Sequence, residues 1–279
     1  MNASNRLNKI SFKENKVIKE GPSDKIKAEY LMYKIVSEDY TLQQYFPYVY
    51  SYLEKEKTSI IELDYIEGIT LYNKYKNCIL IKEDLINILD MVELFHNKKY
   101  EITINEDDIK NFYYDKLYSR LADKIQYPFD DLTQVKEKLF ILLKKMLETY
   151  KINIVPLIHG DLWFSNIIIN GNIIKVIDVR GMIGNIYTTN GDKMYDYAKL
   201  YQSILGFDYI IYGDTINELY LSKTCILFED ELKKRNLDIT HIKYMTLILM
   251  AGSIYFIDNF EKKLTVWNLI KKIIHECGI

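Results

Sequence analysis

The stretch VPLIHGDLWFSNIIINGNIIKVIDVRGMIG, residues 155–184, indicates how the rest of the chain is organised. Two apolar runs with strand character, residues 167–169 and 173–177, flank Asn170-Gly171. This dipeptide predicts a type I′ hairpin turn, because both residues tolerate positive φ. Antiparallel pairing across so short a turn would bring Asn166, at the start, beside Asp178, at the end. An amide oxygen and a carboxylate side by side suit a hard cation, which prefers oxygen ligands.

A second pattern overlaps the start of the hairpin. His159-x-Asp161-x4-Asn166, followed by Asp178, has the spacing of a kinase catalytic loop with its downstream metal-binding aspartate. Phosphoryl transfer needs a carboxylate that orients the acceptor hydroxyl and takes its proton, and oxygen ligands that hold magnesium against the nucleotide phosphates. Asp161 suits the first role, and Asn166 and Asp178 suit the second. Each residue alone could cap a turn or bound a strand, but together, within apolar runs, they indicate a phosphotransferase site.

Composition limits the classes of partner and compartment. The chain has 279 residues, 48% hydrophobic and 27% charged, the balance of a globular protein with a substantial core. Its net charge of −2 predicts no nucleic-acid partner. Cys78, Cys225 and Cys277 are widely spaced and lack metal-ligand spacing, which indicates a reducing compartment. The N-terminus has no apolar secretory region, and the most apolar run, residues 244–257, is too short to span a bilayer. We therefore expect a cytoplasmic protein without a membrane span.

The hydrophobic periodicity changes after Gly68. Before it, the pattern predicts a helix capped by Ser23 or Asp24 and several short strands. The strands are expected at residues 7–12, 16–19, 48–53 and 59–66, and the helix at 24–37. After it, helices are expected at residues 81–96, 109–125, 132–150, 193–205, 215–236, 239–259 and 264–276. The fold class is therefore α+β, with a small antiparallel sheet lobe over residues 1–67 for nucleotide binding. A large, mostly helical lobe over residues 68–279 would carry the catalytic loop and the substrate pocket.

The sequences HGDLWFSN and IDVRG resemble those of the aminoglycoside and choline kinase-like small-molecule phosphotransferases. Members of this family share the two-lobed protein-kinase-like fold. Gly160, between His159 and Asp161, fits this family better than eukaryotic protein kinases, which have Arg there. The resemblance implies ATP or another nucleoside triphosphate, with magnesium, as cofactors, and makes His159 mainly a structural member of the loop. A protein kinase is disfavoured because no activation segment of the Ala-Pro-Glu type follows Asp178.

Weaker matches to the same family occur in the expected order near the N-terminus. Lys19 resembles the strand lysine that contacts the α and β phosphates of the nucleotide, although Lys13 and Lys16 compete for this role. Glu29, on the next predicted helix, resembles its ion-pair partner.

The segment IELDYIEGITL, residues 61–71, resembles the strand and hinge that bind the adenine. The resemblance places Asp64, Tyr65 and Ile66 along the adenine edge, with contacts through backbone groups. One departure concerns the glycine-rich phosphate loop, which should precede the lysine strand, whereas the first glycine is Gly21, after it. Either Ser4-Asn5 and their backbone amides hold the phosphates, or the first strand of the lobe is missing.

The acceptor pocket should lie beyond Asp161. A quaternary amine would need aromatic faces, and an aminoglycoside would need carboxylates. The aromatic candidates are Trp163, Tyr195, Tyr255 and Trp267, and the carboxylates are Glu229, Asp230 and Glu231. The run GD-x-x-YD-x-AKL, residues 191–200, is similar to kinase-like proteins associated with bacterial surface-polysaccharide precursors. By resemblance, Asp196 is structural and Asp192 lies near the substrate.

The predicted function is an ATP- and magnesium-dependent kinase that phosphorylates a hydroxyl of a small metabolite. A sugar, a polyol and an amino alcohol such as choline all fit this description. The alternatives are a degenerate kinase fold that binds a ligand without catalysis, and an aminoglycoside resistance kinase.

Overall fold

The computed structural model describes residues 8–121 and 129–278. The predicted phosphate contacts at Ser4 and Asn5 therefore lie outside the described residues. The chain forms two compact units, one comprising Met1–Thr103 and Val155–Gly191 and the other Ile104–Ile154 and Asp192–Ile279. It passes between them at two short strands, β6 (Ile154–Val155) and β11 (Gly191–Asp192). The predicted lobe boundary at residue 67 remains a prediction.

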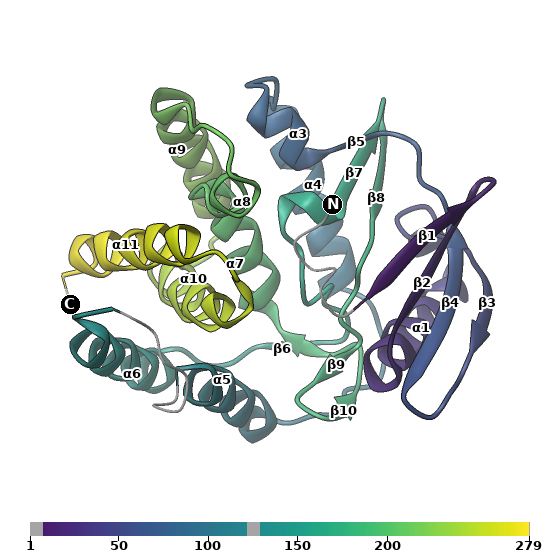
Figure 1. Cartoon of the computed structure of the whole chain (residues 1–279), viewed down its shortest axis with the longest axis horizontal. Coiled ribbons are helices and arrows are strands. Elements are labelled where there is room, and N and C mark those ends of the chain that lie inside the picture. Colours follow the sequence, from purple (N-terminus) through teal and green to yellow (C-terminus); the bar gives the residue numbers. More distant parts are fainter. Residues whose placement is uncertain (1–7, 122–128, 279) are drawn as a thin grey trace. The chain divides into compact units, whose positions relative to one another are not determined.

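Among the described residues, the first unit is built on a four-stranded antiparallel sheet with the order β1-β2-β4-β3 (Figure 1). The strands are β1 (Lys9–Lys13), β2 (Lys16–Pro22), β3 (Val49–Leu53) and β4 (Thr58–Asp64). Alternate residues of β4, Ser59, Ile61 and Leu63, are buried, and helix α1 (Ser23–Ser37) packs against this strand. Lys19 of β2 pairs with Ile61 across the ladder, so it lies on the same buried face.

The start of α1 differs from the prediction. Pro22 occupies the N-cap position, so the predicted capping by Ser23 or Asp24 is wrong. The Ser23 hydroxyl instead donates to the backbone oxygen of Lys55 at 2.5 Å.

The predicted hairpin is present as β7 (Ile167–Asn170) and β8 (Ile173–Val176), with β5 (Ile69–Thr70) on the other edge of β7. Its turn lies one residue further along than predicted, because Asn170 pairs with Ile173 and leaves Gly171 and Asn172 as the loop. Of these two, Gly171 alone has a positive φ, 59°, which fits a type II′ turn and not type I′. The expected juxtaposition of the ends is observed, since the Ile177 N–H donates to the Asn166 backbone oxygen at 3.0 Å.

The segment after a short helix, α2 (Tyr40–Gln43), anchors this hairpin. The backbone oxygen of Tyr45 accepts from the Val176 N–H at 2.7 Å. The Lys175 ammonium donates to the backbone oxygen of Phe46 at 2.8 Å. The Phe46 ring stacks on Phe95, with centroids 5.2 Å apart, and so joins the hairpin to the core of the unit.

The remaining elements of the first unit are α3 (Leu71–Lys76), α4 (Lys82–His96), β9 (Met182–Ile183) and β10 (Ile186–Tyr187). The sequence predicted α4 but neither α2 nor α3, because helices of four and six residues are too short to show a helical period.

The described part of the second unit is helical. Its helices are α5 (Glu106–Arg120), α6 (Leu132–Thr149), α7 (Lys193–Ile204), α8 (Phe207–Tyr212), α9 (Glu218–Lys234), α10 (Ile239–Ser253) and α11 (Phe260–Glu276). Helix α10 is the core of the unit, because it packs against α5, α6, α7 and α11 (Figure 1).

The apolar run around α10 is longer than predicted. Residues Ile239–Phe256 form an 18-residue stretch that is apolar enough to cross a membrane, so the prediction that the run is too short is wrong. Of this stretch 61% is buried inside the protein, as is typical of a core helix, which agrees with the predicted core role.

The carboxylate of Asp39, at the N-cap of α2, makes the stability of the fold depend on pH. It accepts from the Thr41 N–H at 2.9 Å and pairs with the Lys98 ammonium at 2.7 Å. The hydrogen bond from Lys98, followed by that from Thr41, lowers the pKa of Asp39 from 3.8 to about 2. Because the folded-state pKa is depressed, this stabilisation is complete above about pH 4 and is lost as the pH falls toward 2.

We therefore expect the free energy of unfolding of the wild type to fall more steeply between pH 4 and pH 2 than that of Asp39→Asn. Urea unfolding at a series of pH values measures this difference. Asp107→Asn, at a side chain that is 86% exposed, removes the same charge and should keep the wild-type slope. Equal slopes in the wild type and Asp39→Asn would show that Asp39 is not the source.

Candidate active site

The predicted catalytic loop, residues 159–166, is joined to the end of the hairpin by a buried histidine. Nδ1 of His159 accepts from the Asp161 N–H at 3.2 Å, so the ring proton lies on Nε2, which donates to the Ile177 backbone oxygen at 3.0 Å. The Arg180 N–H also donates to the His159 backbone oxygen at 3.0 Å. The neutral imidazole therefore has a structural position between Asp161 and the segment that carries Asp178.

Asn166 presents an amide oxygen that no donor among the described residues satisfies. Its Nδ2 donates to the backbone oxygen of Asp161 at 2.9 Å, which fixes the orientation of the amide. Within the described part of the chain, its buried Oδ1 has no hydrogen-bond partner. A buried acceptor without a donor is unfavourable, and a cation would satisfy it.

Asp178 follows the hairpin in a left-handed backbone conformation, with φ of 60°. Such a conformation is uncommon for a residue with a side chain and is frequent at functional sites. The Asn166 amide oxygen and the Asp178 carboxylate together fit a hard cation such as Mg²⁺. Over residues 8–121 and 129–278, no group of three or more His, Cys, Asp or Glu residues could hold a metal by itself. Phosphate oxygens and water would therefore complete the coordination, as is usual for Mg²⁺ at nucleotide sites.

A buried ammonium joins the sheet, α1 and the Asp178 segment. Lys19 Nζ pairs with Glu29 Oε2 at 2.6 Å and with Asp178 Oδ1 at 2.7 Å. Burial would lower the pKa of Lys19, but the charges of Asp178 and Glu29 outweigh burial and raise it, so the side chain is charged. For Glu29, burial raises the pKa and the Lys19 charge opposes the rise.

The competing lysines have different surroundings. Lys16 pairs with Glu62 at 3.3 Å, with both side chains partly exposed, and Lys13 is exposed. The geometry therefore favours Lys19 for the phosphate contact, which remains a prediction.

Helix α1 lies close to the segment that carries Asp178 at Gly181. This glycine has φ of 62°, and a Cβ there would lie 2.1 Å from the backbone oxygen of Ala28. Ala28 directly precedes Glu29, so this contact sets the spacing between the helix that carries Glu29 and the segment that carries Asp178. The sequence pattern did not mark Gly181 for this role, because the close approach is between residues distant in the chain.

The predicted adenine segment is partly engaged within its own sheet. The Asp64 N–H donates to the Tyr48 backbone oxygen and the Tyr65 N–H to that of Asn15, both at 2.9 Å. The Asp64 carboxylate accepts from the Tyr50 hydroxyl at 2.7 Å. An adenine contact here would therefore use other backbone groups, including those of Ile66, which follows β4.

Two of the predicted aromatic contacts are part of the interior of the second unit. Trp267 is fully buried, stacks on Phe129 with centroids 4.7 Å apart, and donates from Nε1 to Asp131 at 2.7 Å. Tyr195 is also buried, and the Lys116 ammonium lies 4.9 Å from its ring centroid. Their faces are thus occupied by the protein itself. Trp163 is buried in the first unit, whereas Tyr255 is 48% exposed.

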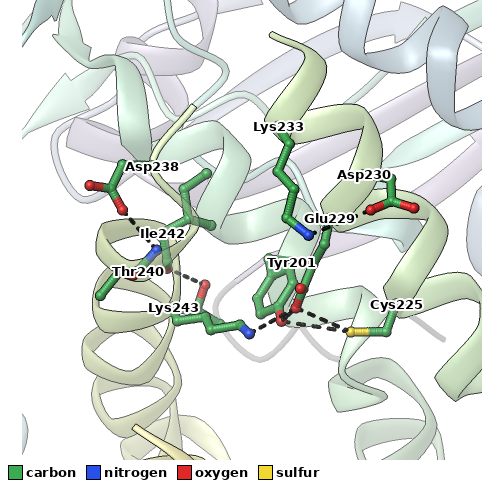
Figure 2. A network of polar contacts seen from close by, with 10 residues as sticks. Tyr201, Cys225, Glu229, Asp230, Lys233, Asp238, Thr240, Ile242 and Lys243 are labelled. Atoms are coloured by element: carbon green, nitrogen blue, oxygen red, sulfur yellow. Dashed lines mark hydrogen bonds and ion pairs between the residues drawn. The ribbon is translucent and has the colours of Figure 1, made fainter. Parts of the chain in front are cut away.

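The three candidate carboxylates are each paired with a cation of the same unit. The pairs are Glu229 with Lys243 at 2.8 Å, Asp230 with Lys233 at 3.5 Å and Glu231 with Lys234 at 2.6 Å. Figure 2 shows that Glu229 also accepts from the Tyr201 hydroxyl, at 2.6 Å. The three carboxylates are thus neutralised by lysines of α9 and α10, and Glu231 is buried, which weighs against these residues as a site for a polycation.

Asp192 and Asp196 are buried within the second unit. Asp192 caps α7 by accepting from the Met194 N–H at 3.1 Å, and it accepts from the hydroxyls of Tyr113 at 2.9 Å and Tyr150 at 2.6 Å. Its observed contacts are therefore structural, as the resemblance implied for Asp196.

No protein-family model and no curated protein matches this chain. Several solved structures are similar to it. A thermostable mutant of aminoglycoside phosphotransferase APH(4)-Ia, in a ternary complex with AMP-PNP and hygromycin B, has a TM-score of 0.63 at 13% identity, over 96% of this chain and 93% of that one. Aminoglycoside phosphotransferase APH(3″)-Id from Streptomyces rimosus has a TM-score of 0.56 at 18% identity, over 88% and 92%. Choline kinase from Cryptosporidium parvum has a TM-score of 0.55 at 13% identity, over 100% and 92%.

These similarities extend over nearly the full length of both chains. The predicted resemblance in fold is confirmed: the chain has the α+β, protein-kinase-like fold of aminoglycoside phosphotransferases and choline kinase.

Substitution at Gly181 tests the close contact of α1. Gly181→Ala places a Cβ against the Ala28 backbone at positive φ, and we expect it to lower the free energy of unfolding by about 2–4 kcal/mol. Gly171 has a similar φ of 59° but open space around its Cα. Gly171→Ala should therefore cost only about 1 kcal/mol. Urea unfolding of both variants measures the difference, and equal losses would contradict a close contact at Gly181.

Proposed function

We propose that this chain is an ATP- and magnesium-dependent kinase that transfers a phosphoryl group to a hydroxyl of a small metabolite. The observation that carries the proposal is the grouping, in one unit, of a buried Lys19 between Glu29 and Asp178 and an unsatisfied Asn166 Oδ1 beside the catalytic loop. A phosphotransferase site needs these groups, whereas a stable fold alone does not need an orphaned acceptor.

Each residue has a distinct role in this proposal. Asn166 and Asp178 hold the magnesium ion, which neutralises negative charge on the nucleotide phosphates. Lys19 turns its ammonium toward the phosphates, and Glu29 keeps that ammonium charged and oriented. Asp161 orients the acceptor hydroxyl and takes its proton.

The remaining residues support this arrangement. His159 holds the backbone of the catalytic loop against Ile177. Asp64, Tyr65 and Ile66 form the adenine edge, with backbone groups beyond β4 as the contacts. ATP or another nucleoside triphosphate fits the same roles.

The proposed acceptor is a neutral sugar, a polyol or an amino alcohol such as choline. The paired state of Glu229, Asp230 and Glu231 disfavours an aminoglycoside at these residues. The run GD-x-x-YD-x-AKL favours a precursor of surface polysaccharide, acted on in the cytoplasm.

A ligand-binding module without catalysis is the second candidate. One observation favours it: in the described residues the first glycine, Gly21, follows Lys19, so no glycine-rich loop precedes the lysine strand. Magnesium-dependent nucleotide binding without turnover on any acceptor would support this alternative.

The decisive experiment is a screen of the purified protein with ATP or GTP and magnesium, following release of the nucleoside diphosphate. The acceptors are monosaccharides, polyols, choline, ethanolamine and aminoglycosides. Turnover that requires both magnesium and one class of acceptor would support the kinase and identify the substrate class.

Asp161→Ala separates catalysis from binding. Because Asp161 is proposed to act on the acceptor proton, we expect turnover to fall about 10²- to 10⁴-fold with nucleotide affinity changed less than about twofold. Steady-state kinetics and calorimetric titration measure the two quantities. Turnover retained in this variant would exclude Asp161 as the base.

Asp178→Ala should have the complementary effect. The loss of a metal ligand is expected to abolish the gain in nucleotide affinity that magnesium gives the wild type. Calorimetric titration with and without magnesium measures this gain. Asp107→Asn, at an exposed carboxylate, is the charge-matched control and should behave as the wild type.

A further inference from the structure

Tyr33 lies on the same face of α1 as Glu29, one helical turn further along. The side chain is 1% exposed, and its ring packs edge-on to Phe46 with centroids 6.3 Å apart. The ring therefore holds the hydroxyl within the interior of the first unit, near the pair formed by Glu29 and Lys19.

The Tyr33 hydroxyl oxygen and Glu29 Oε1 are both buried polar atoms that lack a hydrogen bond of ordinary geometry among the described residues. A tyrosine hydroxyl is a donor and a carboxylate oxygen is an acceptor, so the two atoms can satisfy each other. The other carboxylate oxygen of Glu29 already accepts from Lys19 at 2.6 Å.

The charges of both acidic residues act on the hydroxyl of Tyr33. Burial, followed by the charges of Glu29 and Asp178, raises the pKa of Tyr33 well above its usual value of 10. The hydroxyl therefore keeps its proton and is available as a donor over the whole physiological pH range.

We propose that Tyr33 is a positioning residue, whose hydroxyl donates to Glu29 Oε1 and holds the Glu29 carboxylate in the orientation that directs Lys19 toward the nucleotide phosphates. This inference rests on the proposed function. When Asp178 serves as a metal ligand, its carboxylate is shared between Lys19 and the metal ion. Glu29 then becomes the residue that orients the Lys19 ammonium. A carboxylate fixed at both oxygens does this better than one fixed at a single oxygen.

Tyr33→Phe tests the role, because it keeps the ring and removes only the hydroxyl. We expect the affinity for a non-hydrolysable ATP analogue with magnesium to fall about tenfold, the effect of one lost hydrogen bond to a buried charged group. The KM of the acceptor should not change. Calorimetric titration and steady-state kinetics measure these quantities.

Tyr30→Phe is the matched control on the same helix. Its ring stacks on Tyr52, with centroids 4.2 Å apart, and the substitution also removes one tyrosine hydroxyl. It should leave the analogue affinity unchanged. Wild-type affinity in Tyr33→Phe, or an equal loss in both variants, would overturn the positioning role.

A double-mutant cycle separates this proposal from the function on which it rests. Tyr33→Phe and Glu29→Met, alone and combined, are compared by urea unfolding without nucleotide or metal; if Glu29→Met does not fold, Glu29→Gln replaces it. We expect Tyr33→Phe to lower the folding equilibrium constant about tenfold when Glu29 is present and much less when it is absent. Additive effects would overturn the bond between Tyr33 and Glu29. A second outcome is that Tyr33 and Glu29 are coupled but the wild type binds no nucleotide. That outcome would establish the bond between them and would refute both the kinase function and the role of the bond in directing Lys19.

Discussion

The first unit depends on one buried positive charge. The Lys19 ammonium can be buried only because Glu29 and Asp178 pair with it, at 2.6 and 2.7 Å. Its partners come from α1 and from the segment after β8, so the charge fixes the sheet, the helix and the hairpin relative to one another. The left-handed backbone of Asp178 and the close approach of α1 at Gly181 are the geometric conditions of this pairing.

The segment after β8 also contacts the loop that contains His159, Asp161 and Asn166. The Ile177 N–H donates a hydrogen bond to the backbone oxygen of Asn166, and the Ile177 backbone oxygen accepts one from Nε2 of His159. On the other side, the backbone after α2 accepts from Val176 and thereby anchors β8. The loop with Asp161 and Asn166 is therefore supported by contacts with the backbone of the neighbouring segment.

The proposed acceptor, in contrast, depends on side chains and does not follow from the fold. Solved structures with this fold include aminoglycoside phosphotransferases and a choline kinase. In this chain the acidic residues of α9 are neutralised by neighbouring lysines, and the faces of Trp267 and Tyr195 pack inside the helical unit. Trp267, Tyr195 and the carboxylates of α9, which suggested a cationic acceptor from their chemical type alone, thus have structural partners and give no support for such an acceptor.

The sequence by itself determined the fold class and the hairpin, because these follow from local periodicity and short spacing. The grouping of Asp161, Asn166 and Asp178 as a catalytic site stays a prediction. The sequence placed the turn one residue too early, since the register of β7 and β8 depends on pairing along the whole hairpin. Only the tertiary structure showed that Lys19 is buried whereas Lys13 and Lys16 are not, that Tyr33 is buried as well, and that Gly181 lies against α1. Those features arise from burial and close approach between segments distant in the chain, which leave no periodic signal in the sequence.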